Sequence, residues 1–143
     1  MANWDDTMLV GVPKIDAEHK DIVARVNEFL DALDNGASVL AMHDCFRRME
    51  HSIHRHLYNE EEMLKRLGYP LAETHGDEHD QLLAQLADIW NNMLSNKNFA
   101  PGAAARTWLD NWISQHLQEH DVPYRDWLRA EGLTERANQE MPD

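Results

Sequence analysis

Nine histidines are the most unusual feature of this 143-residue sequence, because imidazole is a common metal ligand and titrates near neutral pH. Two pairs of residues that commonly bind metals are spaced as on a helix. His56 and Glu60 are four residues apart, and so are His75 and His79. That spacing places both side chains on one face of a helix, one turn from each other. Each pair could therefore hold a metal ion from a single helix.

The elements that carry these residues are indicated by apolar periodicity. Apolar residues recur every three or four positions, the pattern of amphipathic helices, in four segments: residues 15–33, 38–67, 71–93 and 105–116. Helix stops or turns lie between them at Asn35-Gly36, Gly68-Tyr69-Pro70 and Pro101-Gly102. No segment shows the strict alternation of a strand. We therefore predict an all-α, up-down-up-down antiparallel four-helix bundle.

The remaining segments complete a single predicted domain of residues 1–143. Residues 1–14 are expected to form an extended arm whose apolar side chains, including Trp4 and Met8, pack on the bundle of residues 15–122. A short C-terminal helix is expected at about 124–131. The polar residues 134–143 are expected to be a frayed tail.

Six ionisable side chains occupy the apolar stripes, where their burial must be compensated. They are His19, His56, Glu60, His75, His79 and His116. In an antiparallel bundle the starts of the first and third helices lie beside the ends of the second and fourth, so these groups meet at one end. A lone histidine there would more simply be a hydrogen-bonded core residue, but five histidines and one glutamate together predict a buried metal centre. Imidazole-rich ligation suits iron, zinc, copper or nickel, and the set is larger than one tetrahedral ion needs.

The order of these residues resembles the hemerythrin family, in particular the bacteriohemerythrins. The matching segments run from Trp4 to about Leu128 and comprise Trp4, Val10-Gly11-Val12, Ile15-Asp16, His19, His56-Leu57-x-x-Glu60-Glu61, Tyr69-Pro70, His75-x-x-x-His79 and Trp112-x-x-x-His116-Leu117-x-x-x-Asp121. The resemblance implies a non-haem di-iron protein that binds dioxygen. It also implies seven metal ligands, namely His19, His56, Glu60, His75, His79, His116 and Asp121.

One of these assignments conflicts with simple helical spacing. His120 lies four residues after His116 and shares its face in a straight α-helix, whereas Asp121 is rotated from that face by about 140°. Spacing alone therefore favours His120, and the resemblance favours Asp121. For Asp121 to be a ligand, the helix must widen locally, or end near Pro123, so that the carboxylate turns inward.

The resemblance further implies two iron ions (Fe2+/Fe3+) bridged by an oxo or hydroxo group and by both carboxylates. One iron would be saturated by His75, His79 and His116, and the other, held by His19 and His56, would keep one open position for dioxygen. Apolar side chains of the stripes are expected to exclude water from this position. Candidates are Ile22, Ile53, Leu57, Leu82 and Ile113.

The expected function is oxygen storage, delivery or sensing, without enzymatic activity. The same ligands could instead serve a di-iron oxidoreductase acting on peroxide or nitric oxide, and the sequence does not separate these alternatives. A zinc- or nickel-holding protein is disfavoured by the pair of Glu60 and Asp121. Dioxygen is the expected partner, and an oxygen-consuming enzyme or a reductase is a candidate protein partner.

Composition excludes several other classes. With 26 acidic and 13 basic residues the net charge is −13, which disfavours nucleic acid and anionic membranes as partners. No apolar run suits membrane insertion, and the N-terminus lacks a secretory signal, so a cytoplasmic location is expected. Polar residues beside the second stripe are expected to be solvated: His43, His51, His54, Glu61 and Glu62.

Overall fold

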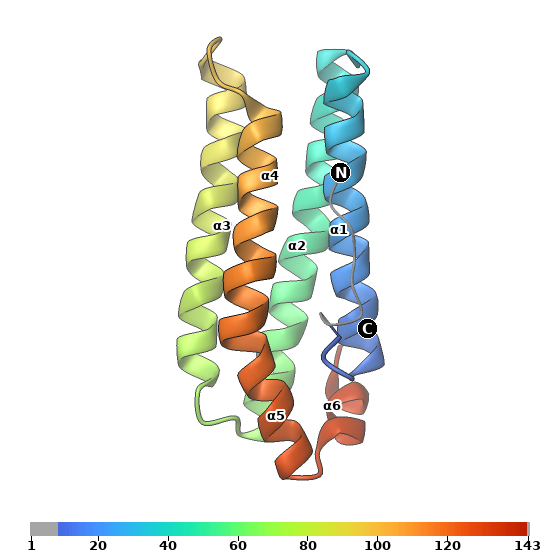
Figure 1. Cartoon of the computed structure of the whole chain (residues 1–143), viewed down its shortest axis with the longest axis vertical. Helices are drawn as coiled ribbons and strands as arrows, with labels where there is room; N and C mark the ends of the chain where they lie inside the picture. The colour runs from blue at the N-terminus through green and yellow to red at the C-terminus, as the bar shows by residue number, and fades with distance from the viewer. Residues whose placement is uncertain (1–8, 143) are drawn as a thin grey trace.

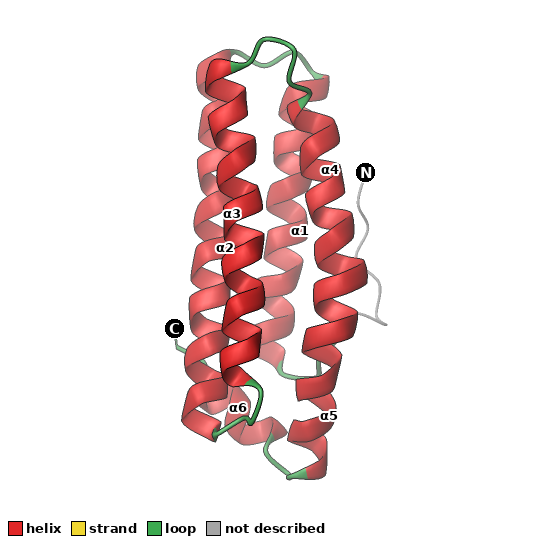
Figure 2. Ribbon diagram, turned by 90° about the vertical axis from the view of Figure 1, so that its left-hand side faces the viewer, coloured by secondary structure: helices red, strands yellow, loops and turns green. Residues whose placement is uncertain are grey.

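The computed structural model describes residues 9–142, which are almost entirely helical, with no strand in that range (Figure 2). The elements are α1 (Pro13–Asp34), α2 (Val39–Leu67), α3 (Ala72–Ser95), α4 (Pro101–Asn111), η2 (Trp112–Asp121), α5 (Val122–Ala130) and α6 (Thr134–Glu140). Long helices α1 to α4 alternate in direction, with α1–α2 and α3–α4 connected at one end and α2–α3 at the other (Figure 1). The predicted all-α four-helix bundle is confirmed.

Local sequence explains where the first two helices begin and end. Ser38 precedes α2, and its side chain accepts a hydrogen bond from the backbone N–H of Ala41. Gly68 ends α2 with φ +74°, a left-handed conformation that glycine adopts without steric cost. Before α1, the carboxylate of Asp16 accepts hydrogen bonds from the backbone N–H groups of Val10 and Gly11. These bonds fix the chain that enters the first helix.

The fourth long helix continues further than expected. Segments α4, η2 and α5 follow each other without a break, so the chain stays helical through Pro123. Pro123 lies in the first turn of α5, where a missing N–H and a fixed φ are tolerated. The middle segment, η2, is a π-helix of 10 residues, a wider form of helix with i→i+5 hydrogen bonds.

The apolar core consists of two clusters. The larger one is shared by the four long helices and includes Ile22, Phe29, Phe46, Leu86 and Trp108. The smaller end cluster is formed by the N-terminal arm, the start of α1, the end of α2, the α2–α3 connection, α5, α6 and the residue after α6. Its members are Val10, Val12, Ile15, Met63, Leu64, Tyr69, Tyr124, Leu128, Ala137 and Met141. Along α1, α2 and the fourth helix, the predicted metal ligands lie in sequence between members of the two clusters. They therefore form a polar layer with apolar packing on either side.

The C-terminal residues differ from the predicted frayed tail. Residues 134–140 form α6, whose Ala137 is fully buried, and Met141 directly after it is 2% exposed. Asn138 accepts a hydrogen bond from the backbone N–H of Lys14, and Arg66 of α2 donates to the carbonyl of Glu140. The segment is polar in sequence, but its buried residues Ala137 and Met141 and these two hydrogen bonds dock the short helix on α1 and α2. In the arm, Val10 and Val12 are buried as expected, whereas Trp4 and Met8 lie outside the described residues.

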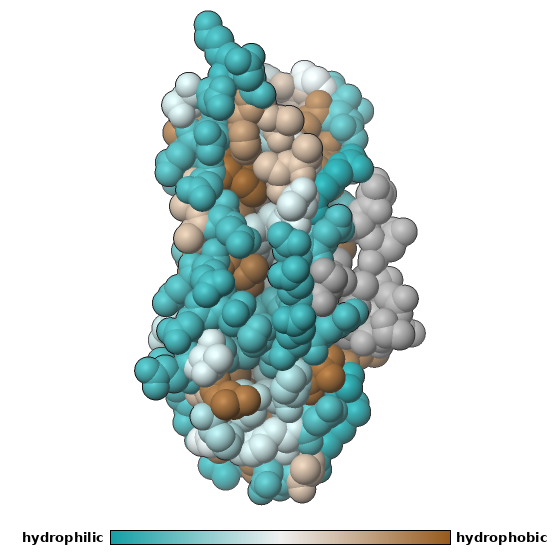
Figure 3. All heavy atoms as spheres, turned by 60° about the vertical axis from the view of Figure 1, so that its left-hand side comes forward, coloured by the Kyte–Doolittle hydropathy of each residue, from teal (hydrophilic) through white to brown (hydrophobic). Residues whose placement is uncertain are grey.

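Hydrophilic residues cover most of the face shown in Figure 3, and hydrophobic atoms form separate small areas on it. This surface agrees with the strongly acidic composition. Within residues 9–142, every helix is too short or too polar to span a bilayer.

Candidate metal centre

The structure brings all seven predicted ligands together in the polar layer. His19 comes from α1, His56 and Glu60 from α2, His75 and His79 from α3, and His116 and Asp121 from η2. Each is 2% exposed or less. Two groups emerge that share the same carboxylates, and we name them by their imidazoles: the three-His set and the two-His set.

The three-His set consists of His75, His79 and His116. Nε2 of His75 lies 2.5 Å from Oε1 of Glu60 and 3.2 Å from Oδ1 of Asp121. Nε2 of His79 lies 3.1 Å from the same Glu60 oxygen and 3.1 Å from Nε2 of His116. Nε2 of His116 in turn lies 3.2 Å from Oδ1 of Asp121. Three imidazole nitrogens and one oxygen of each carboxylate thus surround one point.

The two-His set consists of His19 and His56, whose Nε2 atoms are 3.0 Å apart. The remaining carboxylate oxygens face this set. Oε2 of Glu60 lies 3.3 Å from Nε2 of His56 and 3.7 Å from Nε2 of His19. Oδ2 of Asp121 lies 3.5 Å from Nε2 of His19. Glu60 and Asp121 therefore stand between the two sets, each with one oxygen toward either side.

These donors fit a pair of metal ions. Ligand atoms at right angles around one ion are about 3.0 Å apart when each bond is about 2.1 Å, close to most of the separations within each set. Both oxygens of Asp121 are buried and, among the described residues, accept no hydrogen bond of good geometry. A buried carboxylate without such partners is costly, and cations on both sides would satisfy it. Imidazole with carboxylate is a donor set for first-row transition metals.

The π-helix resolves the conflict over the last ligand. In η2 the helix is wound more widely, with i→i+5 hydrogen bonds, and Asp121 lies on the side of His116, so the local widening that an Asp121 ligand requires is present. His120 instead lies at the rim, 24% exposed, with Nε2 3.4 Å from Oε1 of Glu78. Its ring centroid is 6.3 Å from that of His75. The structure thus brings Asp121, and not His120, into contact with both sets.

Two carboxylates outside the sets hold the far sides of the imidazoles. Oε1 of Glu18 lies 2.8 Å from Nδ1 of His56, and its other oxygen accepts a hydrogen bond from the amide of Asn59. Oε2 of Glu61 lies 3.2 Å from Nδ1 of His79. Such partners orient an imidazole and strengthen it as a metal donor. Each set therefore contains one carboxylate-supported histidine.

Glu61 was expected to be a solvated surface charge, and this expectation is wrong. Its side chain is only 27% exposed because it turns toward His79 across the α2–α3 contact. Gly76 provides the room, since a Cβ atom there would lie 2.9 Å from Oε1 of Glu61. The adjacent Glu62 is exposed to a similar extent, 30%, and forms an ion pair with Arg66.

Tyr124 is a further contact that sequence reasoning missed. Its hydroxyl donates a hydrogen bond of 2.9 Å to Oε2 of Glu60, and its side chain is fully buried. Burial, reinforced by the charge of Glu60, raises the pKa of Tyr124 well above its usual value, so the hydroxyl keeps its proton. The only sequence signal was the spacing of Tyr124 in the short predicted helix.

In the absence of cations, protonated imidazoles balance the charge of the buried carboxylate of Glu60. Burial would lower the pKa of His56 and of His75, but the charge of Glu60 raises the pKa of each to about 10, assisted at His56 by Glu18. At His19, burial and the charge of His56 lower the pKa. Burial would raise the pKa of Glu60, yet His75 and His56 hold it well below its usual value. A metal must therefore displace protons from His56 and His75.

The outer carboxylates are expected to matter for metal retention. We predict that Glu18→Gln lowers metal affinity by about 10-fold to 100-fold, because the neutral amide supports the imidazole of His56 less strongly. Competition with a coloured chelator measures the change. Glu62→Gln is the matched control, since Glu62 forms its ion pair with Arg66 and not with an imidazole of either set. Equal metal retention by both variants would contradict a role for Glu18.

The other residues singled out in the sequence have less specific places. His51 and His54 are exposed, and His43 is half-buried with its ring centroid 5.0 Å from that of Trp90. Four of the apolar neighbours proposed to exclude water are buried in the main core: Ile22, Ile53, Leu57 and Leu82. The side chain of the fifth, Ile113, lies outside the described residues.

Comparison with known proteins agrees with this geometry. The family profile described as "Hemerythrin HHE cation binding domain" matches residues 10–122. A bacteriohemerythrin of Stenotrophomonas maltophilia is 23% identical over 127 residues, covering 89% of this chain and 81% of the relative. For a bacteriohemerythrin of Clostridium acetobutylicum the values are 26% over 129 residues, 86% and 98%. A hemerythrin-like protein of Naegleria gruberi is 24% identical over 126 residues, covering 88% and 92%.

The matched region contains all seven predicted ligands, and it spans far more than half of the sequence. The helical bundle and the clustered imidazoles are what a cation-binding domain of this kind requires. The chain therefore belongs to the hemerythrin family.

Proposed function

We propose that this chain binds two iron ions, one in each ligand set, and binds dioxygen reversibly for storage, delivery or sensing. The observation that carries the proposal is the unequal number of imidazoles. Three histidines face one position and two face the other, while Glu60 and Asp121 direct one oxygen to each. The position beside His19 and His56 is therefore the one with room for an external ligand.

Iron bound in the two sets would supply the redox-active centre at which dioxygen is held and released. The residues of the chain prepare that centre in three ways. Glu18 and Glu61 orient one imidazole in each set, and Tyr124 fixes Oε2 of Glu60. Packing of Ile22, Ile53 and other residues of the main cluster excludes water from the side facing the bundle interior. The end cluster covers the opposite side.

The donor composition favours binding over oxidative chemistry. The proposed ligands are five neutral imidazoles and two carboxylates, whereas carboxylate-rich shells stabilise higher oxidation states of iron more strongly. An interior without bulk water also limits the proton supply that irreversible oxidation of the metals consumes. Reversible binding is thus the outcome that these residues favour.

Visible absorption of the iron-loaded, reduced protein tests this function. We expect a charge-transfer band on exposure to air that disappears on degassing and returns on re-exposure. His56→Ala should abolish the band because it removes half of the two-His set. His54→Ala, two residues away and exposed, is the matched control and should leave the band intact. Steady consumption of hydrogen peroxide or nitric oxide in the presence of a reductant, without a reversible band, would instead establish a di-iron oxidoreductase.

A further inference from the structure

Trp112 carries a buried hydrogen-bond donor without an acceptor. The residue is fully buried, and within the described part of the chain its indole Nε1 has no hydrogen-bond partner. Buried polar atoms are nearly always paired, so an unpaired donor requires an explanation. The indole nitrogen can only donate a hydrogen bond, because it has no lone pair available to accept one.

Bound metal ions do not remove this deficit. Cations in the two ligand sets would satisfy the oxygens of Asp121, which are acceptors that also lack hydrogen bonds. An N–H group needs an electron pair and gains nothing from a cation. The N–H of Trp112 therefore still lacks a hydrogen-bond acceptor after the metals are in place, and only a group with an acceptor atom can supply one.

The position of Trp112 identifies where such a group would come from. Its ring is in edge-to-face contact with the ring of His19, with centroids 5.2 Å apart and planes at 87°. His19 belongs to the two-His set, the position proposed to receive an external ligand. Trp112 is the first residue of η2, one turn before His116, so it reaches the site from the same segment as Asp121.

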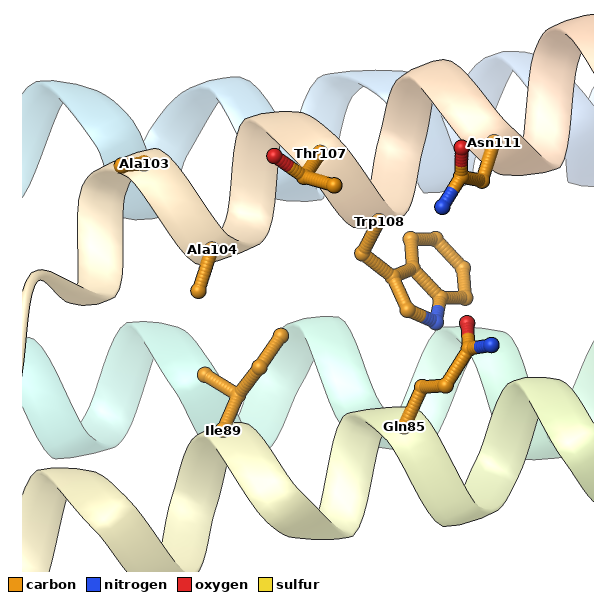
Figure 4. Close-up of a pocket in the computed structure, with 7 residues that line it drawn as sticks. All are labelled: Gln85, Ile89, Ala103, Ala104, Thr107, Trp108 and Asn111. Atoms are coloured by element: carbon orange, nitrogen blue, oxygen red, sulfur yellow. The ribbon is translucent and has the colours of Figure 1, made fainter.

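Trp108 provides an internal contrast. Its ring is stacked on that of Trp112, with centroids 6.3 Å apart and planes at 11°, and it is also buried. Its Nε1 is satisfied, however, because it donates a hydrogen bond of 3.1 Å to the carbonyl of Leu82. Trp108 lines a groove of about 330 Å³ between α3 and α4 together with Gln85, Ile89 and Thr107 (Figure 4). One indole of the stacked pair thus donates to the scaffold, whereas the other, whose ring contacts that of His19, has no acceptor among the described residues.

We propose that the indole N–H of Trp112 is the hydrogen-bond donor for a small ligand seated at the two-His set, and that it selects ligands carrying an acceptor atom, above all small anions. This inference rests on the proposed function, because it requires a metal with an open position beside His19. A donor in a dry interior acts strongly on a charged acceptor, since no water competes for it. Ligands without an acceptor atom gain nothing from it.

Azide binding to the iron-loaded ferric protein tests the inference. We expect Trp112→Phe to weaken azide binding by roughly tenfold to a hundredfold, the range for one hydrogen bond to a charged group. The antisymmetric stretch of bound azide should shift in the same variant and lose its sensitivity to exchange into D2O. Trp108→Phe makes the same deletion in the neighbouring indole and should bind azide like the parent. Equal azide affinity and equal stretching frequency in the two variants would overturn the inference.

A second variant guards against loss of packing at position 112. Benzothienylalanine keeps the two-ring shape of tryptophan and replaces the N–H by sulfur, so azide affinity should fall as in Trp112→Phe even if the Phe variant folds poorly. Retained affinity with this analogue would also overturn the inference. Failure of the proposed function is distinguishable, because it would be seen in the parent as the absence of a reversible oxygen band, whereas azide binding needs only ferric ions at the site.

Discussion

Asp121→Ala is expected to lose most of the bound iron, whereas His120→Ala keeps the iron content of the parent. Both oxygens of Asp121 are buried and lie 3.2–3.5 Å from imidazole nitrogens of the two sets, so its removal weakens both metal positions. His120 is at the rim and contacts Glu78. Iron per chain after anaerobic loading, measured by elemental analysis, gives the result.

Two controls make this comparison decisive. His116→Ala removes an imidazole of the three-His set from the same segment and sets the scale for loss of a ligand. Circular dichroism shows whether each variant keeps its helices, since most of the bundle is packed around apolar residues far from the layer. If His120→Ala lost as much iron as His116→Ala, the assignment of Asp121 would be wrong and α-helical spacing would have been the better guide.

The same pair of residues shows what could be predicted from the sequence. The four apolar stripes and their polar members predict the bundle and the end at which His19, His56, His75 and His116 meet. Simple helical spacing could not predict Asp121, because the wider winding of the π-helical segment departs from the spacing of an α-helix. In that case the resemblance to known sequences supplied what periodicity could not.

Residues that act across helices were out of reach for a different reason. Glu18 directly precedes His19 and therefore lies about 100° away around α1. Its partner, His56, is on α2, and only the packing of the two helices brings them together. Glu61 contacts His79 of α3 in the same way. Helix α6 escaped prediction because its docking depends on the small side chain of Ala137 and on Met141 just beyond it.

Metal binding is expected to raise the thermal midpoint, by an amount that grows as the pH increases from about 6.5 to 9. The elevated pKa values of His56 and His75 stabilise the metal-free protein fully below the unfolded-state histidine pKa of about 6.5. This contribution is lost as the pH rises toward the folded-state value of about 10. The metal-free midpoint should therefore fall across the range.

In the metal-loaded protein two effects oppose each other, so its midpoint should change little over this range. Binding requires neutral imidazoles, so fewer protons compete with the metal as the pH rises, and the contribution of binding to stability increases. At a free metal concentration of one hundred times the dissociation constant, binding adds about 2.7 kcal/mol, which corresponds to about 10 °C for a chain of this size. Melts of loaded and chelated protein at several pH values measure both trends. Coincident midpoints at neutral pH would show that the buried layer does not bind metal.

The π-helical segment also sets the angular phase of everything that follows it. If the segment kept its π-helical winding, removing a single residue between His116 and Asp121 would turn α5 by roughly a quarter of a turn about its axis relative to α4. Tyr124 would then turn away from Glu60, and Leu128 would leave the end cluster that it shares with Met63 and Ala137. The number of residues in this continuous helical stretch therefore sets three positions at once. It fixes where the carboxylate of Asp121 lies, where the hydroxyl of Tyr124 meets Glu60, and where α5 packs into the end cluster.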